Sequence, residues 1–284
     1  MENLFRRVKG IYVGITGRDR KRWALVLILY YTFFAAALHY LPVGKYWETT
    51  LFYDALYFLL PAAVLVYVSG GWKAVLPGSL AVGITMGVLY HNVMYLSDSY
   101  SFYTLVHAGG IPYFWNVFWH PMVAFLVLGV YTFWTEREAE FDYFRGFFLL
   151  AGSFALLGVF IAHRQAIVSL LESPKPYLYV VAPALVLSAL IIGSRLPTER
   201  LRSVMRTAPL LTFPFLLYSY LSVSIFRGVN FDSSYLFRVP VMDAAIPVEE
   251  FFNWGLMFPL LIMIIYEWTL EGEEEGSESK KVQK

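Results

Sequence analysis

The chain contains no cysteine and few charged residues. Without cysteine it can form no disulfide bond, thiolate metal site or cysteine nucleophile. Only 15% of its 284 residues are charged whereas 58% are hydrophobic, which is more apolar surface than a soluble domain of this length can bury. The net charge of +1 says nothing about partners, and the basic N-terminal segment is interpreted as a membrane anchor and not as a nucleic-acid site. The composition therefore predicts an integral membrane protein without a nucleic-acid partner.

Long apolar runs recur along the whole chain, and several reach the roughly 18–24 residues needed to cross a bilayer. The runs are continuous rather than alternating, which argues against a membrane β-barrel, so each run inside hydrocarbon must form a helix. We therefore predict an all-α integral membrane protein with about eight transmembrane helices. The predicted segments are 23–41, 51–68, 76–96, 111–134, 144–163, 177–192, 208–226 and 248–268.

The distribution of Lys and Arg predicts the orientation of these helices. If the N-terminus lies in the cytoplasm, 17 of the 22 Lys and Arg fall in cytoplasmic segments, as the positive-inside rule requires. Residues 1–22 are basic and carry apolar residues at helical spacing, so we expect them to lie on the anionic inner leaflet. The charged tail, 271–284, is predicted to be disordered. The sequence thus predicts a multi-pass protein of the cell membrane with both termini cytoplasmic.

Two segments in the first half of the chain are similar in sequence to two segments in the second half. The similar pairs are 57–70 with 179–193 and 97–112 with 231–247, and each of the last two stretches ends in Ile-Pro at the start of an apolar run. We therefore predict two tandem four-helix repeats, 23–140 and 141–270. Because four is an even number of helices, both repeats have the same orientation, unlike the inverted repeats of many transporters.

Polar side chains are concentrated in the outer half of the predicted bundle. Intramembrane polar groups are expensive, and by default they mark a site that faces the bundle interior. Their one-sided distribution predicts a cavity that opens toward the outer side. Besides the histidines, they are Asp54, Asn92, Asp98, Asn116, Glu249, Glu250 and Asn253.

The most informative motif is IPVEEFFNWG at 246–255. Glu249 and Glu250 fall in the first turn of the last predicted helix, where the helix dipole favours carboxylates, and one interpretation is that they only start this helix. Asn253 can reach either acid by helical spacing, and the motif also contains the aromatic residues Phe251, Phe252 and Trp254. A carboxyl in such surroundings tends to keep its proton, and a neutral acid in an apolar pocket can protonate a carbon–carbon double bond.

A second group of polar residues lies on the third and fourth predicted helices. Asn116 and His120 are four residues apart, and His91 lies in the outer part of the preceding helix. Hydrogen bonds between helices explain such residues in lipid, and a proton relay or a metal site with an acid are the functional alternatives. No HxxxH, HExxH or ExxH pattern is present, so we predict no metal and no other cofactor.

At PVEEFFNW the chain resembles the lycopene cyclase domain of archaeal, actinobacterial and fungal carotenoid enzymes, in which a Pro-x-Glu-Glu motif opens a helix and precedes aromatic residues. NFDSSYLF, from Asn230, resembles the aromatic-Asp loop of that family, and the specific match spans about 230–266. The resemblance implies a cofactor-free enzyme acting on polyisoprenoid ends, with Glu249 and Glu250 as the acids. The first repeat has IPYFWNVFWH where the acids would be expected, so a relative acting on another isoprenoid or lipid is as plausible.

Taken together, these features predict a membrane enzyme that acts on an isoprenoid or related lipid by acid-initiated alkene chemistry such as cyclisation. Glu249 and Glu250 would be the catalytic acids. The substrate-binding residues would be Asn253, Trp254, Phe251, Phe252, His91, Asn116 and His120. Two alternatives stay open, a non-enzymatic protein that binds or transports a lipid or small solute, and a structural membrane subunit. Homo-oligomerisation is also left open.

Overall fold

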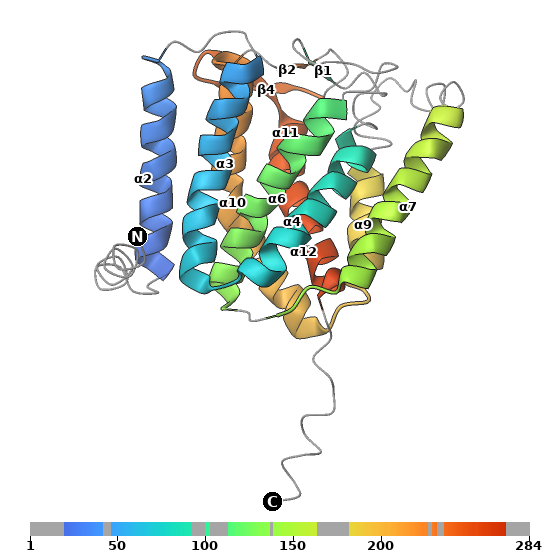
Figure 1. Ribbon diagram of the computed structural model, residues 1–284. Helices are drawn as coiled ribbons and strands as arrows, with labels where there is room; N and C mark the ends of the chain where they lie inside the picture. The colour runs from blue at the N-terminus through green and yellow to red at the C-terminus, as the bar shows by residue number, and fades with distance from the viewer. Residues whose placement is uncertain are drawn as a thin grey trace, which may run out of the picture.

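The computed structural model describes residues 20–41, 47–91, 100–102, 113–136, 139–163, 182–226, 229–231 and 236–270. Within them the chain is mostly helical, and eight helical segments lie side by side as a bundle (Figure 1). The first seven are α2 (Arg20–Leu38), α3 (Trp47–Ser69), α4 (Trp72–Met86), α6 (Tyr113–Thr135), α7 (Tyr143–Ala162), α9 (Ala182–Gly193) and α10 (Thr198–Ser224). The eighth begins as α11 (Val248–Phe252), continues through the π-helical turn η3 (Asn253–Met257) and ends as α12 (Phe258–Thr269). A second π-helical turn, η1 (Gly87–His91), extends α4.

Each predicted apolar segment overlaps one of these helices, so the prediction of a helical protein is confirmed. The largest difference is at α10, which begins at Thr198 whereas its apolar run begins at residue 208. Hydropathy does not predict the first turns of α10, because these turns are charged and precede the apolar run. The basic segment 1–22 and the tail 271–284 lie almost wholly outside the described residues.

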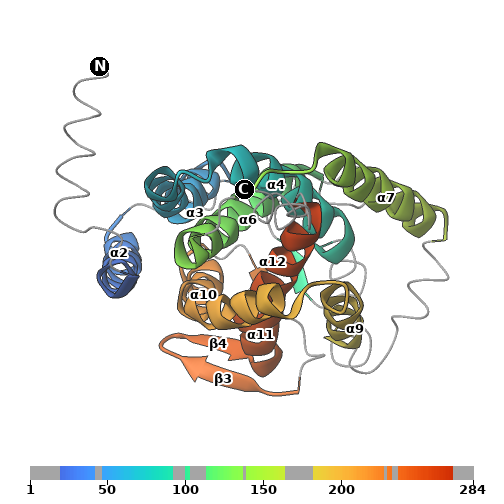
Figure 2. The ribbon, with the colours of Figure 1, turned by 90° about the horizontal axis from the view of Figure 1, so that it is seen from below.

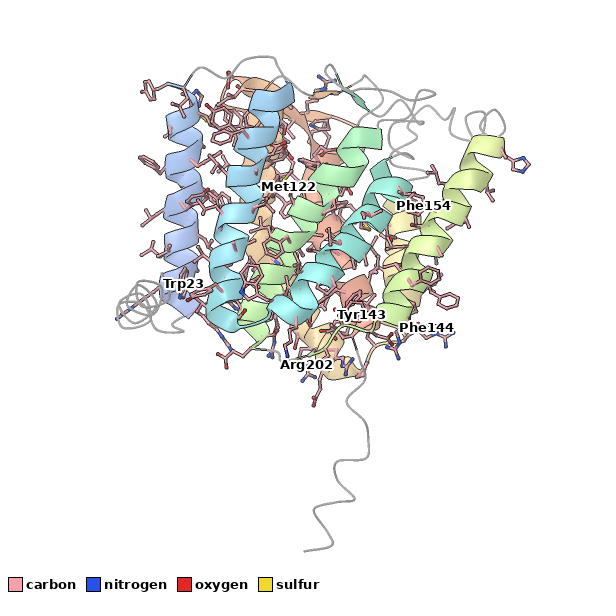
Figure 3. The ribbon with its side chains drawn as sticks, viewed as in Figure 1. Trp23, Met122, Tyr143, Phe144, Phe154 and Arg202 are labelled. Atoms are coloured by element: carbon pink, nitrogen blue, oxygen red, sulfur yellow. The ribbon has the colours of Figure 1, made fainter. Side chains whose placement is uncertain are left out.

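Three helices among the described residues are long and apolar enough to cross a membrane, Phe52–Ser69, Trp72–Leu89 and Val248–Thr269. Two shorter apolar helices, Arg22–Leu38 and Tyr143–Val159, accompany them. Large apolar side chains are also exposed on the peripheral helices, such as Phe33 on α2 and Phe144 on α7, with 75% and 70% of their surface exposed. Figure 3 shows Phe144 on the outside of α7. Such a surface is suited to lipid, and these features together indicate a multi-pass membrane protein.

The view along the bundle places α6 and α12 at its centre, with α2 and α7 at opposite edges (Figure 2). Helix α6 packs against α3 and α4, while α12 packs against α9 and α10. The two central helices also contact each other. The core is therefore formed around α6 and the α11–α12 helix, which carry His120 and the Glu249–Glu250 pair.

A short β-hairpin precedes α11 at the end of the bundle opposite the end of α12 (Figure 1). Strand β3 (Arg238–Val241) pairs antiparallel with β4 (Ala244–Pro247). At the turn Met242 has a positive φ of 52°, a conformation that is unfavourable for a residue other than glycine. Asp243 beside it accepts hydrogen bonds from Ser224 and Tyr220, and these bonds lower the pKa of Asp243. These two hydrogen bonds thus hold the hairpin against the end of α10.

Strand β1 (Tyr100–Phe102) pairs antiparallel with β2 (Val229–Phe231). These strands belong to the connections that precede α6 and α11, respectively. The pairing therefore joins the two connections that the sequence comparison predicted to be equivalent. Most of the connection that precedes α6, including residues 103–112, lies outside the described residues, as do residues 232–235 of the connection that precedes α11.

Candidate functional site

The two acids of the PVEE motif begin α11 and are buried. Pro247 ends strand β4 and takes the N-cap position of the helix. Glu249 and Glu250 follow in the first turn, with 5% and 1% of their surface exposed. Glu249 Oε1 accepts a hydrogen bond of 2.6 Å from the backbone N–H of Leu236. Glu250 Oε1 is buried and has no hydrogen-bond partner among the described residues.

The helix departs from α geometry directly after the acids. The backbone N–H of Asn253 donates to the carbonyls of Glu249 and Glu250, and the N–H of Phe258 donates to the carbonyl of Asn253. The second bond spans five residues, which defines a π turn, and π turns inside α-helices occur frequently at functional sites. Asn253 is fully buried.

Aromatic rings from three helices surround Trp254. Its ring centroid lies 4.5 Å from that of Phe258, 5.3 Å from that of Trp119 on α6 and 6.1 Å from that of Phe215 on α10. We call these four residues the aromatic cluster. Trp254 follows Glu250 by four residues in the same continuous helix, within the π turn η3. The cluster therefore provides the ring faces that could stabilise a cation near this acid.

The other predicted aromatic residues lie differently. Phe251 is partly buried and packs against the core, whereas Phe252 keeps 40% of its surface exposed. The rings that contact Trp254 are those of Trp119, Phe215 and Phe258, which sequence reasoning did not select. Their helices carry many aromatic residues, and nothing in the sequence distinguishes these three from the others.

His120 joins the site from α6. It is fully buried, and its ring centroid lies 4.7 Å from that of Trp119 and 6.0 Å from that of Phe258. The structure thus brings His120 to the aromatic cluster. His91 is the last residue of η1 and Asn116 lies in α6, but their side chains are outside the described part of the structure.

A further acid, Asp54 on α3, is fully buried in the same half of the bundle. Its Oδ1 accepts a hydrogen bond of 2.7 Å from the Tyr218 hydroxyl on α10. The Tyr218 oxygen in turn accepts a hydrogen bond of 3.0 Å from Trp119 Nε1. Sequence reasoning noted Asp54 only as one of several outer polar residues, although an acid inside a predicted span is itself a signal of a site.

Comparison with protein-family models, with curated proteins and with solved structures finds no match for this chain. The resemblance to lycopene cyclase domains therefore rests on the motif residues alone and stays a hypothesis. In the described part of the chain, no group of three His, Asp or Glu side chains could hold a metal ion.

Proposed function

We propose that this protein is a membrane enzyme that converts a polyisoprenoid or related lipid by acid-initiated alkene chemistry, such as cyclisation. The observation that carries the proposal is the buried Glu249–Glu250 pair, which shortly precedes Trp254 of the aromatic cluster in the same helix. A general acid for an alkene must hold a proton away from water, and the cation that forms needs ring faces nearby. The arrangement combines both properties.

The two acids differ in their surroundings, and the difference assigns their roles within the proposal. Glu249 Oε1 already accepts a hydrogen bond from the backbone of Leu236, which suits a positioning residue. Glu250 is the more deeply buried acid, with 1% of its surface exposed against 5% for Glu249. Glu250 is therefore the proposed catalytic acid. Asn253, four residues after Glu249 and fully buried, would orient the pair.

The reaction needs no cofactor. Glu250 would give its proton to one carbon of a double bond, and the cation left on the other carbon would be attacked by a second double bond to close a ring. A neighbouring C–H would then return a proton to the Glu250 carboxylate. One proton enters the substrate and one leaves it, so that the product is an isomer of the substrate.

We further propose that the bundle spans the membrane eight times as two equivalent halves. In support, α2 packs on α10 and α7 packs on α4, so that each peripheral helix contacts the other half in the same way. The Arg-rich start of α10, the start of α2 and the end of α12 share one end of the bundle (Figures 1 and 3). That end would be cytoplasmic by the positive-inside rule, and the acids would then lie toward the outer side.

The test is turnover in deuterated water by the full chain in lipid nanodiscs. The probes are linear polyisoprenoids of one chain length, with and without a terminal hydroxyl. We expect an isomeric product that carries one solvent deuteron, identified by chromatography and mass spectrometry. Glu250→Gln should slow its formation by about 10²–10⁴-fold, because an amide cannot supply the proton.

Glu199→Gln is the matched control. Glu199 is also an acid in the first turn of a helix, but it is exposed and begins α10 at the opposite end of the bundle. Its substitution should leave turnover unchanged. If wild-type protein binds the probes but forms no deuterated isomer from any of them, the catalytic proposal is wrong and a lipid-binding or transport protein is the better description.

A further inference from the structure

The carboxyl of Asp54 is a second buried acid that the proposed reaction does not use. It comes from α3, on the other side of α6 from α11, and is fully buried. Among the described residues Asp54 takes part in one chain of hydrogen bonds, which begins at Trp119 Nε1, passes through the Tyr218 hydroxyl and ends at Asp54 Oδ1. The donor and acceptor in each of these hydrogen bonds determine which Asp54 oxygen can carry a proton.

An indole N–H can only donate a hydrogen bond. The Tyr218 oxygen therefore accepts from Trp119, and its own proton is directed to Asp54 Oδ1 at 2.7 Å. Oδ1 is thereby fixed as an acceptor. When Asp54 is protonated, its proton must lie on the other oxygen, Oδ2.

Asp54 Oδ2 is buried and has no hydrogen-bond partner within the described residues. Asp54 also forms no ion pair with a Lys, Arg or His in that part of the chain. A buried charge without a counter-charge is strongly unfavourable, so the neutral acid is the form that the site accommodates. Its free O–H is then a donor that lacks an acceptor, and such a donor is costly to leave unsatisfied.

The position of the chain connects Asp54 to the proposed site. The Trp119 ring that orients Tyr218 also contacts Trp254, with ring centroids 5.3 Å apart. Phe58, from the same helix as Asp54, packs edge-on against Trp119 at 5.9 Å. Asp54 is thus joined through Tyr218 and Trp119 to the aromatic cluster, whose Trp254 follows Glu250 in the last helix.

We propose that the O–H on Asp54 Oδ2 donates a hydrogen bond to a neutral oxygen acceptor, a hydroxyl or carbonyl, on the molecule that Glu250 acts upon. The substrate would then be an oxygenated isoprenoid or lipid and not a pure hydrocarbon. This inference rests on the proposed function only in placing both acids at one ligand. In it Asp54 binds the substrate and transfers no proton.

The test compares two substitutions of nearly the same shape. Asp54→Asn keeps an oxygen that can accept from Tyr218 and an N–H that can donate in place of Oδ2, whereas Asp54→Leu keeps neither. The probes are a linear isoprenoid alcohol and the hydrocarbon of the same chain length, and their binding to the full chain in detergent is measured by native mass spectrometry. We expect Asp54→Leu to reduce the preference for the alcohol by about fivefold to tenfold, as expected for one lost hydrogen bond.

Asp54→Asn should retain the preference for the alcohol, and binding of the hydrocarbon should be the same in all three proteins. If Asp54→Leu retains the preference, or if Asp54→Asn loses it as fully as Asp54→Leu, the donor role is overturned. Infrared spectroscopy provides a measurement that does not depend on the folding of Asp54→Leu. The Asp54 band is the protonated-carboxyl band that disappears in Asp54→Asn. It should shift when the alcohol binds and not when the hydrocarbon binds. Absence of such a band would also overturn the inference.

The binding measurements are repeated with Glu250→Gln, which stops the proposed turnover. If Glu250→Gln still prefers the alcohol, and this preference still depends on Asp54, the inference holds even if no product is ever formed. Conversely, turnover of the hydrocarbon probe that Asp54→Leu leaves unaffected would overturn this inference while the proposed function stands.

Discussion

Two glutamates in the last helix, Glu250 and Glu267, are buried to the same extent, with 1% of their surface exposed. Glu267 lies near the opposite end of the helix from Glu250. Its Oε1 accepts a hydrogen bond of 2.6 Å from the Tyr131 hydroxyl, and its Oε2 lies 3.7 Å from Arg200 Nη1. Glu267 therefore joins α12 to α6 and α10, whereas Glu250 Oε1 has no hydrogen-bond partner among the residues that the structure describes. Equal burial thus corresponds to a structural role in one case and a proposed chemical role in the other.

The structural role of Glu267 predicts that Tyr131→Phe destabilises the protein. Removing the hydroxyl takes a donor from a buried carboxyl, which should lower the free energy of unfolding by about 1–3 kcal/mol. Thermal unfolding in detergent would measure the loss. Tyr143→Phe is the control, because Tyr143 is 72% exposed and should have little effect. Equal stability of the two variants would show that the Tyr131–Glu267 bond does not contribute.

At the scale of helices, the site depends on two close contacts. A Cβ added to Gly83 on α4 would lie 2.5 Å from the Cα of Pro121 on α6. Gly255, in the π turn η3, lies against Thr212 of α10, and the Thr212 hydroxyl donates a 2.6 Å hydrogen bond to the Gly255 carbonyl. The first contact fixes the backbone next to His120, and the second fixes the π turn that follows Glu250.

We predict that Gly83→Ala lowers stability although alanine is the better helix former. The new methyl group would meet backbone atoms of Pro121, which cannot turn aside like a side chain, so that α4 and α6 must separate. The free energy of unfolding should fall by about 1–3 kcal/mol. Gly152→Ala on α7 is the matched control, since its Cβ would meet nothing within 4 Å. At Gly152 the higher helix propensity of alanine should dominate and raise the free energy of unfolding by up to about 1 kcal/mol. Unfolding in denaturant would compare them, and a stabilised Gly83→Ala would contradict the close packing.

At the scale of the whole molecule, the ends of the bundle differ in chemistry. One end carries the β3–β4 hairpin with the buried Glu249 and Glu250, and the other carries the arginines at the start of α10, including Arg202 (Figure 3). This asymmetry is the basis for the proposed orientation, because the positive end should remain in the cytoplasm.

The orientation can be tested by labelling, because the natural chain has no cysteine. Met242→Cys in the hairpin turn should react with a membrane-impermeant maleimide on intact cells, since Met242 is 79% exposed. Arg202→Cys, at the opposite end, should react only after the membrane is permeabilised. Unsubstituted protein should not react at all. The reverse pattern would invert the topology, and labelling of both positions on intact cells would contradict a membrane-spanning bundle.

The sequence by itself determined the helices and the place of the Glu249–Glu250 pair in the first turn of the last helix. It could do so because a helix in hydrocarbon must satisfy its own backbone, so an apolar run defines a helix without reference to the rest of the chain. Only the tertiary structure decided which side chains meet. Tyr218 and Asp54 are 164 positions apart and Tyr218 and Trp119 are 99 apart, and no local pattern encodes contacts between such distant residues. The tertiary structure also decided that Trp254 points inward and Phe252 outward. Both residues lie at a π turn, which breaks the regular helical period that a sequence pattern uses to assign faces.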